Sequence, residues 1–211
     1  MKNVVATCIA IAGLALAAPA QADDFQHWQI KLGVSGVLPN ESASISPIGG
    51  NVRISDEYVP SAQVEYFLTP NISAELLCCT ARHDVGAVAT AVGNVDLGKV
   101  SHFPPTVTLK YHWTDFGAIE PYVGAGVNYT HFFSAHLPSG GPVTDIHYRD
   151  SFGGALQAGV DYRLNDHWGL NFDVRRIWIH SNVRMHAGPT AISAKTDIDP
   201  WVVTSAVSYR F

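Results

Sequence analysis

The sequence predicts an all-β protein, an eight-stranded antiparallel transmembrane β-barrel with long extracellular loops and short periplasmic turns. Three observations predict this fold class. The chain opens with residues typical of an export signal, it then contains eight segments in which apolar and polar residues alternate, and its last segment ends on the aromatic Phe211. Alternation with a period of two places one set of side chains on each face of a strand, and such segments of about ten residues are typical of membrane barrels.

Residues 1–22 are predicted to be a cleaved secretory signal peptide. Lys2 supplies a positive start, and residues 4–18 form an apolar run that is shorter than the roughly 20 residues of a membrane helix. Residues 20–22 form a small-x-small cleavage site, so the barrel domain is placed at 23–211. Because only helices and closed barrels satisfy their backbone in lipid, and no later apolar run is long enough for a helix, the expected location is the bacterial outer membrane.

The eight segments follow one another along the chain with the same pattern. The first, 28–35, places Leu32 on one face and Lys31 on the other. The last places Val203 and Val207 on one face and Thr204 on the other. The segments in order are 28–35, 61–68, 72–78, 106–113, 123–130, 151–163, 168–175 and 201–211.

The connections between these segments alternate strictly between short and long. Short turns rich in Asn, Asp, Gly or Pro occur at 69–71, 115–117 and 165–167. The long connections are 39–57, 81–102, 134–149 and 181–197. Outer-membrane barrels alternate in this way between short periplasmic turns and longer extracellular loops. An even number of strands then puts both termini of the barrel domain in the periplasm.

The aromatic residues indicate the same orientation, because membrane barrels carry aromatic girdles at both interfaces. The alternative is that aromatic residues simply favour strand ends in any sheet. The predicted periplasmic rim contains Trp28, Tyr66, Tyr111, Trp113, Tyr162, Trp168, Tyr209 and Phe211. The predicted outer rim contains Tyr58, Phe103, Tyr129, Phe133, Phe152, Trp178 and Trp201.

Four blocks of residues resemble the OmpW family of outer-membrane proteins. They are FPPTVTL at 103–109, PYVGAGVNYT at 121–130, FGGALQAGVDY at 152–162 and DPW at 199–201. The resemblance covers nearly the whole mature chain, and the second block is specific. It implies an eight-stranded barrel with a narrow apolar channel for the uptake or passage of small hydrophobic molecules.

The resemblance also implies partners and an alternative role. Outer-membrane lipid and small hydrophobic solutes are the expected partners, and the final Phe211 resembles the end that the barrel-assembly machinery recognises. Some family members are phage or bacteriocin receptors or respond to stress. A structural or receptor barrel without transport is therefore the alternative function.

Charged residues fall on the phase of the strands that faces the barrel interior. An eight-stranded barrel is just wide enough for side chains to fill it, and unpaired buried charge is costly. We therefore expect a paired network that holds the barrel together; a polar conduction path is the alternative. The predicted network is Lys31, Glu65, Glu75, Lys110, Asp161, Arg163, Asp173 and Arg175.

Four apolar residues share the inward phase towards the outer end. Leu77, Phe132, Ile177 and Ile179 are predicted to line an apolar ligand pocket above the charged network. Ordinary filling beneath the loops is the alternative. The hypothesis is that a hydrophobic ligand enters at the loops, contacts these residues and leaves sideways into lipid where strands part.

Histidine is abundant in the outer half, at His83, His102, His131, His136, His147, His180 and His186. These residues lack tight metal-ligand spacing, so no metal or other cofactor is predicted. A lipid-modifying enzyme is a further alternative, but no Gly-x-Ser-x-Gly motif or triad is present, and no catalytic residue is predicted.

Composition and cysteine usage limit the possible partners and the class of barrel. Because the net charge is −5 and no block of basic residues is present, no nucleic-acid partner is predicted. Adjacent Cys78 and Cys79 would point to opposite faces of a strand and are interpreted as small apolar residues; an intermolecular disulfide is the alternative. A soluble lipocalin-like barrel would need a polar outer face, which residues such as Val127 and Phe172 do not provide.

Overall fold

The computed structural model describes residues 25–211, so the predicted signal peptide lies outside the described residues. Within that range, no helix has the length and apolar character needed to cross a membrane. The strands are β1 (Trp28–Leu38), β2 (Ser42–Ser46), β3 (Asn51–Ile54), β4 (Glu57–Thr69), β5 (Ile72–Cys79), β6 (Ala81–Thr90), β7 (Gly93–Phe103), β8 (Thr106–His112), β9 (Ile119–His136), β10 (Asp145–Tyr148), β11 (Ser151–Arg163), β12 (Trp168–Ile177), β13 (His180–Ala187), β14 (Thr190–Asp197) and β15 (Trp201–Arg210).

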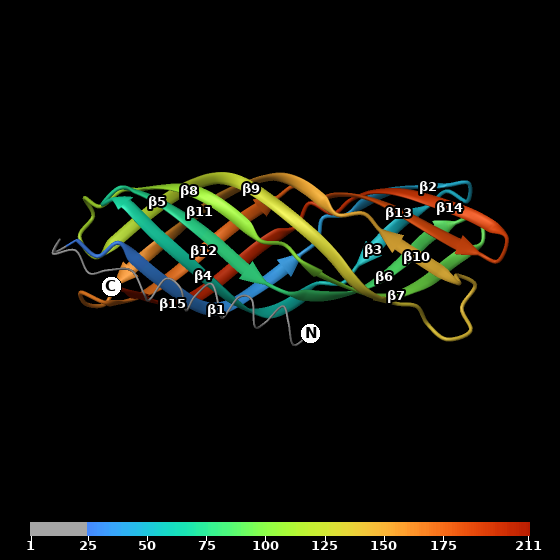
Figure 1. Ribbon diagram of the computed structural model, residues 1–211, viewed down its shortest axis with the longest axis horizontal. Coiled ribbons are helices and arrows are strands. Elements are labelled where there is room, and N and C mark those ends of the chain that lie inside the picture. Colours follow the sequence, from blue (N-terminus) through green and yellow to red (C-terminus); the bar gives the residue numbers. More distant parts are fainter. Residues whose placement is uncertain (1–24) are drawn as a thin grey trace.

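Eight of these strands close into an antiparallel barrel (Figure 1). Around the wall their order is β1, β4, β5, β8, β9, β11, β12 and β15, and β15 pairs back with β1. Gln29 lies opposite Arg210 and Leu38 opposite Trp201, so the closing pair is bonded along its length. The predicted eight-stranded antiparallel barrel is confirmed.

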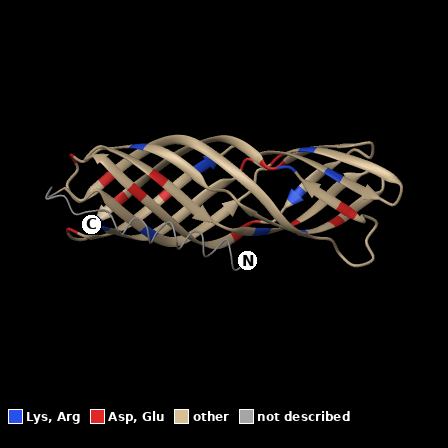
Figure 2. Cartoon of the chain, in the orientation of Figure 1, with Lys and Arg blue, Asp and Glu red and all other residues tan. Residues whose placement is uncertain are grey.

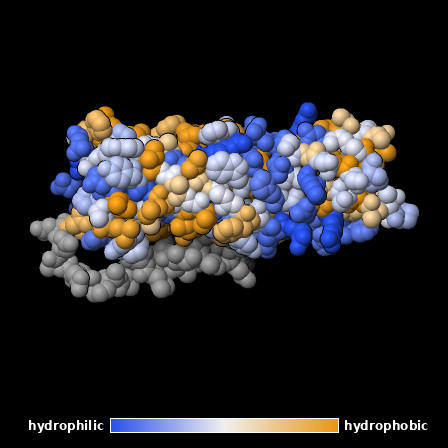
Figure 3. All heavy atoms as spheres, turned by 90° about the horizontal axis from the view of Figure 1, so that it is seen from above, coloured by the Kyte–Doolittle hydropathy of each residue, from blue (hydrophilic) through white to orange (hydrophobic). Residues whose placement is uncertain are grey.

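The barrel wall shows the alternation that the sequence predicts. Outward residues such as Leu32, Leu109 and Phe172 are exposed, whereas the residues between them are buried inside the barrel. Figure 3 shows apolar side chains gathered over the barrel half, followed by a hydrophilic zone beyond it. Because an outward residue of a barrel meets no second sheet, this apolar face needs a surrounding lipid phase.

The four long connections, expected as loops, are largely strands. β6, β7 and β3 continue the wall beside β9, while β10, β13, β14 and β2 form a separate four-stranded sheet. We call these seven strands, together with the outer part of β9, the outer extension; it occupies the right half of Figure 1.

The outer extension forms because its hairpins carry apolar faces of their own. Val85 and Ala87 of β6 and Val183 and Met185 of β13 alternate with exposed residues and are buried in one shared cluster. Burial of these faces against each other removes apolar surface from water, which a solvated loop would leave exposed. The barrel therefore ends in a second, apolar chamber outside the apolar belt.

Candidate functional site

The barrel interior is filled by a buried ion network. Lys31 of β1 places its Nζ 2.7 Å from Glu65 Oε2 of β4 and 3.0 Å from Glu75 Oε2 of β5. Lys110 of β8 contacts the same two carboxylates at 2.9 and 3.0 Å. All four side chains have no exposed surface, so each charge depends on its partners for stabilisation.

Further charged groups extend this network across the barrel. Arg175 Nη2 of β12 lies 2.7 Å from Glu75 Oε1 and 3.3 Å from Asp173 Oδ1. Asp161 of β11 lies 3.5 Å from Lys31 Nζ. Figure 2 shows acidic and basic positions on the barrel strands from several sides of the wall. Seven of the eight charged residues predicted from the sequence are thus in direct contact with one another.

Arg163, the eighth predicted residue, lies apart from this network. Its side chain is 53% exposed, its Nε lies 3.1 Å from Glu120 Oε1, and its Nη2 donates to the carbonyl of Gly117. The reason is its position as the last residue of β11, at the rim formed by the short turns. Arg163 therefore belongs to the periplasmic mouth.

Two neutral residues complete the network, although they were not among the residues predicted to form it. The Tyr122 hydroxyl donates to Asp173 at 2.9 Å, and Lys110 Nζ lies 3.7 Å from the centre of the Tyr122 ring. Gln157 Nε2 donates to Glu75 Oε1 at 2.9 Å. The inward phase of β9 and β11 was the signal that could have identified them.

The periplasmic mouth is closed by stacked side chains below the network. The Arg210 guanidinium lies 3.7 Å from the centre of the buried Phe67 ring and 5.3 Å from that of Phe25. Its Nε donates to the carbonyl of Gln26 at 2.9 Å. A cavity of about 510 Å³ lies at this mouth, and its lining includes Phe25, Glu120, Arg163 and Arg210.

The predicted apolar pocket residues divide into two places. Ile177 and Ile179 lie in one buried cluster with Ala155 and Val202, and Phe132 packs against it. This barrel-mouth cluster lies at the outer ends of β12 and β15. Leu77 is equally buried but is not part of that cluster, because it lies across the barrel on β5, opposite Thr106 of β8.

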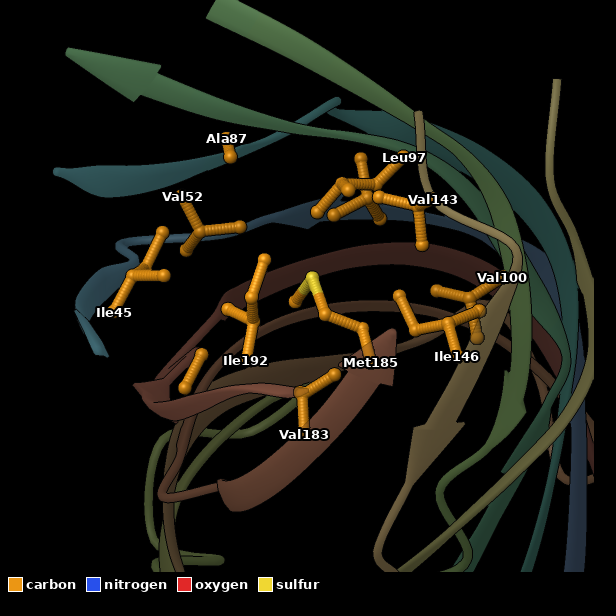
Figure 4. Close-up of a cluster of buried hydrophobic side chains, with 12 residues drawn as sticks. Ile45, Val52, Ala87, Leu97, Val100, Val143, Ile146, Val183, Met185 and Ile192 are labelled. Carbon is orange, nitrogen blue, oxygen red and sulfur yellow. The ribbon is translucent and has the colours of Figure 1, made fainter. Parts of the chain in front are cut away.

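A larger apolar chamber lies in the outer extension (Figure 4). Its buried cluster contains Leu97 of β7, Ile146 of β10, Met185 of β13 and Ile192 of β14. A cavity of about 630 Å³ opens beside these side chains, and residues 138–143 form part of its lining. The sequence reasoning missed this chamber because its residues fall in segments that were expected to be loops.

Phe132 connects the outer chamber to the barrel mouth. It packs against the outer cluster as well as against the barrel-mouth cluster. A small cavity of about 40 Å³ at this junction is lined by Phe132, Tyr148 and Ile198 together with residues of the outer cluster. Burial raises the pKa of the Tyr148 hydroxyl to about 12, so this lining is neutral. Phe132 thus joins the two apolar clusters, and apolar side chains extend from the outer chamber to the barrel mouth.

The histidines of the outer half are dispersed among several contacts. His131 Nδ1 lies 2.9 Å from Asp150, and His180 Nδ1 lies 2.6 Å from Asp197. His83 and His102 contact each other inside the extension. Among residues 25–211, no three His, Cys, Asp or Glu side chains converge as a metal site.

These features define the class of protein. A closed eight-stranded barrel with an apolar outer belt and an interior filled by charged side chains is an outer-membrane β-barrel. The family model described as "OmpW family" matches residues 25–211, and the chain belongs to that family.

Individual relatives agree with this assignment. The chain is 41% identical over 186 residues to the uncharacterized outer-membrane protein y4mB of Sinorhizobium fredii, covering 87% of this chain and 80% of that protein. It is 33% identical to outer membrane protein W of Vibrio cholerae, covering 95% and 98% of the two chains. The crystal structure of OprG from Pseudomonas aeruginosa superposes with a TM-score of 0.81 at 26% identity, covering 88% and 96%.

Proposed function

We propose that this outer-membrane barrel takes up small, uncharged apolar molecules from outside and releases them into the membrane. The observation that carries the proposal is the apolar chamber of the outer extension and its contact, through Phe132, with the apolar cluster at the barrel mouth. A concave and mostly apolar lining favours apolar ligands, because removal of apolar surface from water drives their binding.

The ion network supports release above it rather than passage through the barrel. Lys31, Lys110 and Arg175 are each held by two or more acidic groups and have no exposed surface. An apolar molecule that displaced these contacts would leave buried charges unpaired, at a cost of about 3–5 kcal/mol for each broken pair. The route therefore turns sideways at the barrel mouth.

An interruption in the wall, between the β5–β8 pair and the β6–β7 pair, favours this sideways exit. The β5–β8 ladder ends at Leu77 opposite Thr106, and the β6–β7 ladder begins at Ala81 opposite His102. Pro104 and Pro105 lie between the two ladders and have no N–H to donate. Leu77 is buried directly beside this interruption, so we assign it to the exit and Phe132, Ile177 and Ile179 to the mouth.

The experiment measures uptake by cells that contain or lack the protein, with one apolar and one charged solute. The apolar solute alone should enter faster when the protein is present. Leu77→Arg should remove this difference because a cation would occupy the exit, while the exposed control Asn182→Arg on β13 should retain it. Equal uptake with and without the protein would reject transport and favour the structural or receptor role.

A further inference from the structure

Four rings form an aromatic ladder across the interior of the outer extension. The ring centres of His83 and His102 are 5.1 Å apart, those of His102 and Phe132 are 5.9 Å apart, and those of Phe132 and Tyr148 are 5.7 Å apart. The rings come from β6, β7, β9 and β10 in turn. Because Phe132 and Tyr148 line the small cavity at the junction, the ladder lies where the outer chamber meets the barrel mouth.

The histidine end of the ladder is held by one hydrogen bond whose direction is fixed. His83 Nδ1 lies 2.6 Å from the carbonyl oxygen of Ser55, which can only accept, so this nitrogen carries a proton. His83 Nε2 is then the acceptor in the neutral ring, and His102 Nε2 donates to it across 3.1 Å. His102 Nδ1 is left as an acceptor that no donor of the described residues reaches. In this arrangement both rings are neutral, and one N–H is shared between the two Nε2 atoms.

Few charged groups surround this pair. Asp84 of β6 and Asp56 and Glu57, next to the start of β4, act on His83. Among residues 25–211, His83 is the one titratable group that acts on His102, and the neighbouring elements β9 and β10 present Phe132 and the neutral Tyr148. Burial lowers the pKa of His83, and burial followed by the proximity of His83 lowers the pKa of His102 to about 3.

We propose that the His83–His102 pair is a proton-operated latch on the aromatic ladder, which opens the outer chamber to the barrel mouth when the outside becomes acidic. A proton added to His102 Nδ1 creates a cation that no carboxylate contacts. Protonation of both rings sets two N–H groups and two positive charges against each other across the 3.1 Å contact. Either event favours separation of the rings, which releases the His102 face of Phe132.

The expected pH dependence follows from linkage. The open form exposes the imidazoles to water, where their pKa returns towards about 6.5. At pH values between the pKa of the exposed imidazole and the lowered pKa of the buried one, the open form binds more protons than the closed form. Each proton bound on opening therefore raises the ratio of open to closed form by up to about tenfold per pH unit of acidification. Opening is therefore favoured on the acid side.

The inference rests on the proposed uptake function, so the test uses two readouts. The first is nuclear magnetic resonance of the full chain in lipid nanodiscs, which follows the His83 and His102 ring signals and the ring-current shifts of Phe132 between about pH 7 and pH 4. The second is transfer of pyrene, whose charge does not depend on pH, into vesicles that contain the protein.

For the wild type, the Phe132 shifts should change together with histidine protonation, and pyrene transfer should rise several-fold on the acid side. His102→Phe retains a ring for the stack but cannot bind a proton, so both responses should be lost while transfer at neutral pH is retained. His83→Gln should also abolish the response. The exposed His147→Gln on β10 is the matched control and should behave as the wild type.

The outcomes separate the two proposals. Absence of pyrene transfer at every pH rejects the uptake function, whatever the rings do. Transfer that is present but independent of pH, or Phe132 shifts that remain constant while the histidines gain protons, rejects the latch. An acid response that persists in His102→Phe rejects it as well, because another group would then carry the response.

Discussion

Lys31 and Glu65, two side chains with no exposed surface, meet at 2.7 Å in the middle of the barrel. Glu75 links this pair to the rest of the network, because Lys31, Lys110, Arg175 and Gln157 all contact it. The barrel therefore has at its centre a set of charges that are stable only together.

Glu75→Gln should strongly destabilise the barrel. The change keeps the size of the side chain but leaves three cations with one fewer buried carboxylate, which should cost about 3–5 kcal/mol. Thermal unfolding in detergent should show a lower midpoint. Asp166→Asn, at the exposed turn between β11 and β12, is the control and should change little. A Glu75→Gln barrel as stable as the wild type would contradict the assigned role of the network.

Tyr122→Phe should have a smaller effect. The ring that faces Lys110 is retained, but the hydroxyl that donates to Asp173 and accepts from Asn171 is lost. Removal of one partner from buried polar groups costs about 1–3 kcal/mol. Tyr122→Leu should cost more because it also removes the contact between the ring and Lys110. Equal losses in the two variants would show that the ring contact contributes nothing measurable.

Gly126→Ala should prevent assembly of the barrel or severely weaken it. A Cβ at Gly126 of β9 would overlap with the carbonyl oxygen of Val107 on β8, and a strand backbone cannot move aside cheaply. Gly86→Ala is the matched control, since its Cβ would meet nothing closer than 3.5 Å. The yield of folded barrel on refolding into detergent distinguishes them; normal yield of Gly126→Ala would be the contrary result.

The outer extension should lose stability on acidification. Burial lowers the pKa of His102 to about 3, below that of the unfolded ring, so the unfolded state binds more protons between about 6.5 and 3. The contribution of His102 is full above that window and falls as the pH decreases through it. Hydrogen exchange of β6 and β7 amides at several pH values checks this, with His102→Phe as reference. Equal pH profiles of the two proteins would contradict it.

The barrel itself could be predicted because its wall repeats a period-two pattern in every strand. Inward and outward positions were both correct for residues such as Lys31 and Leu32, and the short turns matched the ends of β4, β8 and β11. Contacts within the interior were harder to predict. The alternation along a strand indicates that Tyr122 and Gln157 point inwards, but it does not indicate which charged side chains they contact.

The outer extension could not be predicted from the same pattern. Val183, Met185 and Ile192 alternate over short segments whose apolar face has no obvious partner in the sequence. That partner is the sheet of β6 and β7, about one hundred residues earlier, and only the closed barrel brings the two together. The separation of Leu77 from Ile177 could not be predicted either. The alternation shows that both side chains point inwards, but not that their strands lie on opposite sides of the barrel.

The seam between β1 and β15 has a consequence for biogenesis. Trp28 and Phe211 exchange backbone hydrogen bonds of 3.0 and 2.8 Å across it, so the first strand to leave the ribosome finds its second neighbour only when the last strand has been made. Until then β1 and β12 are open edges, ready to pair with other chains. A chain cut short before β15 should therefore aggregate rather than form a seven-stranded wall, and the cell must keep the exported polypeptide apart from its copies until the barrel closes in the membrane.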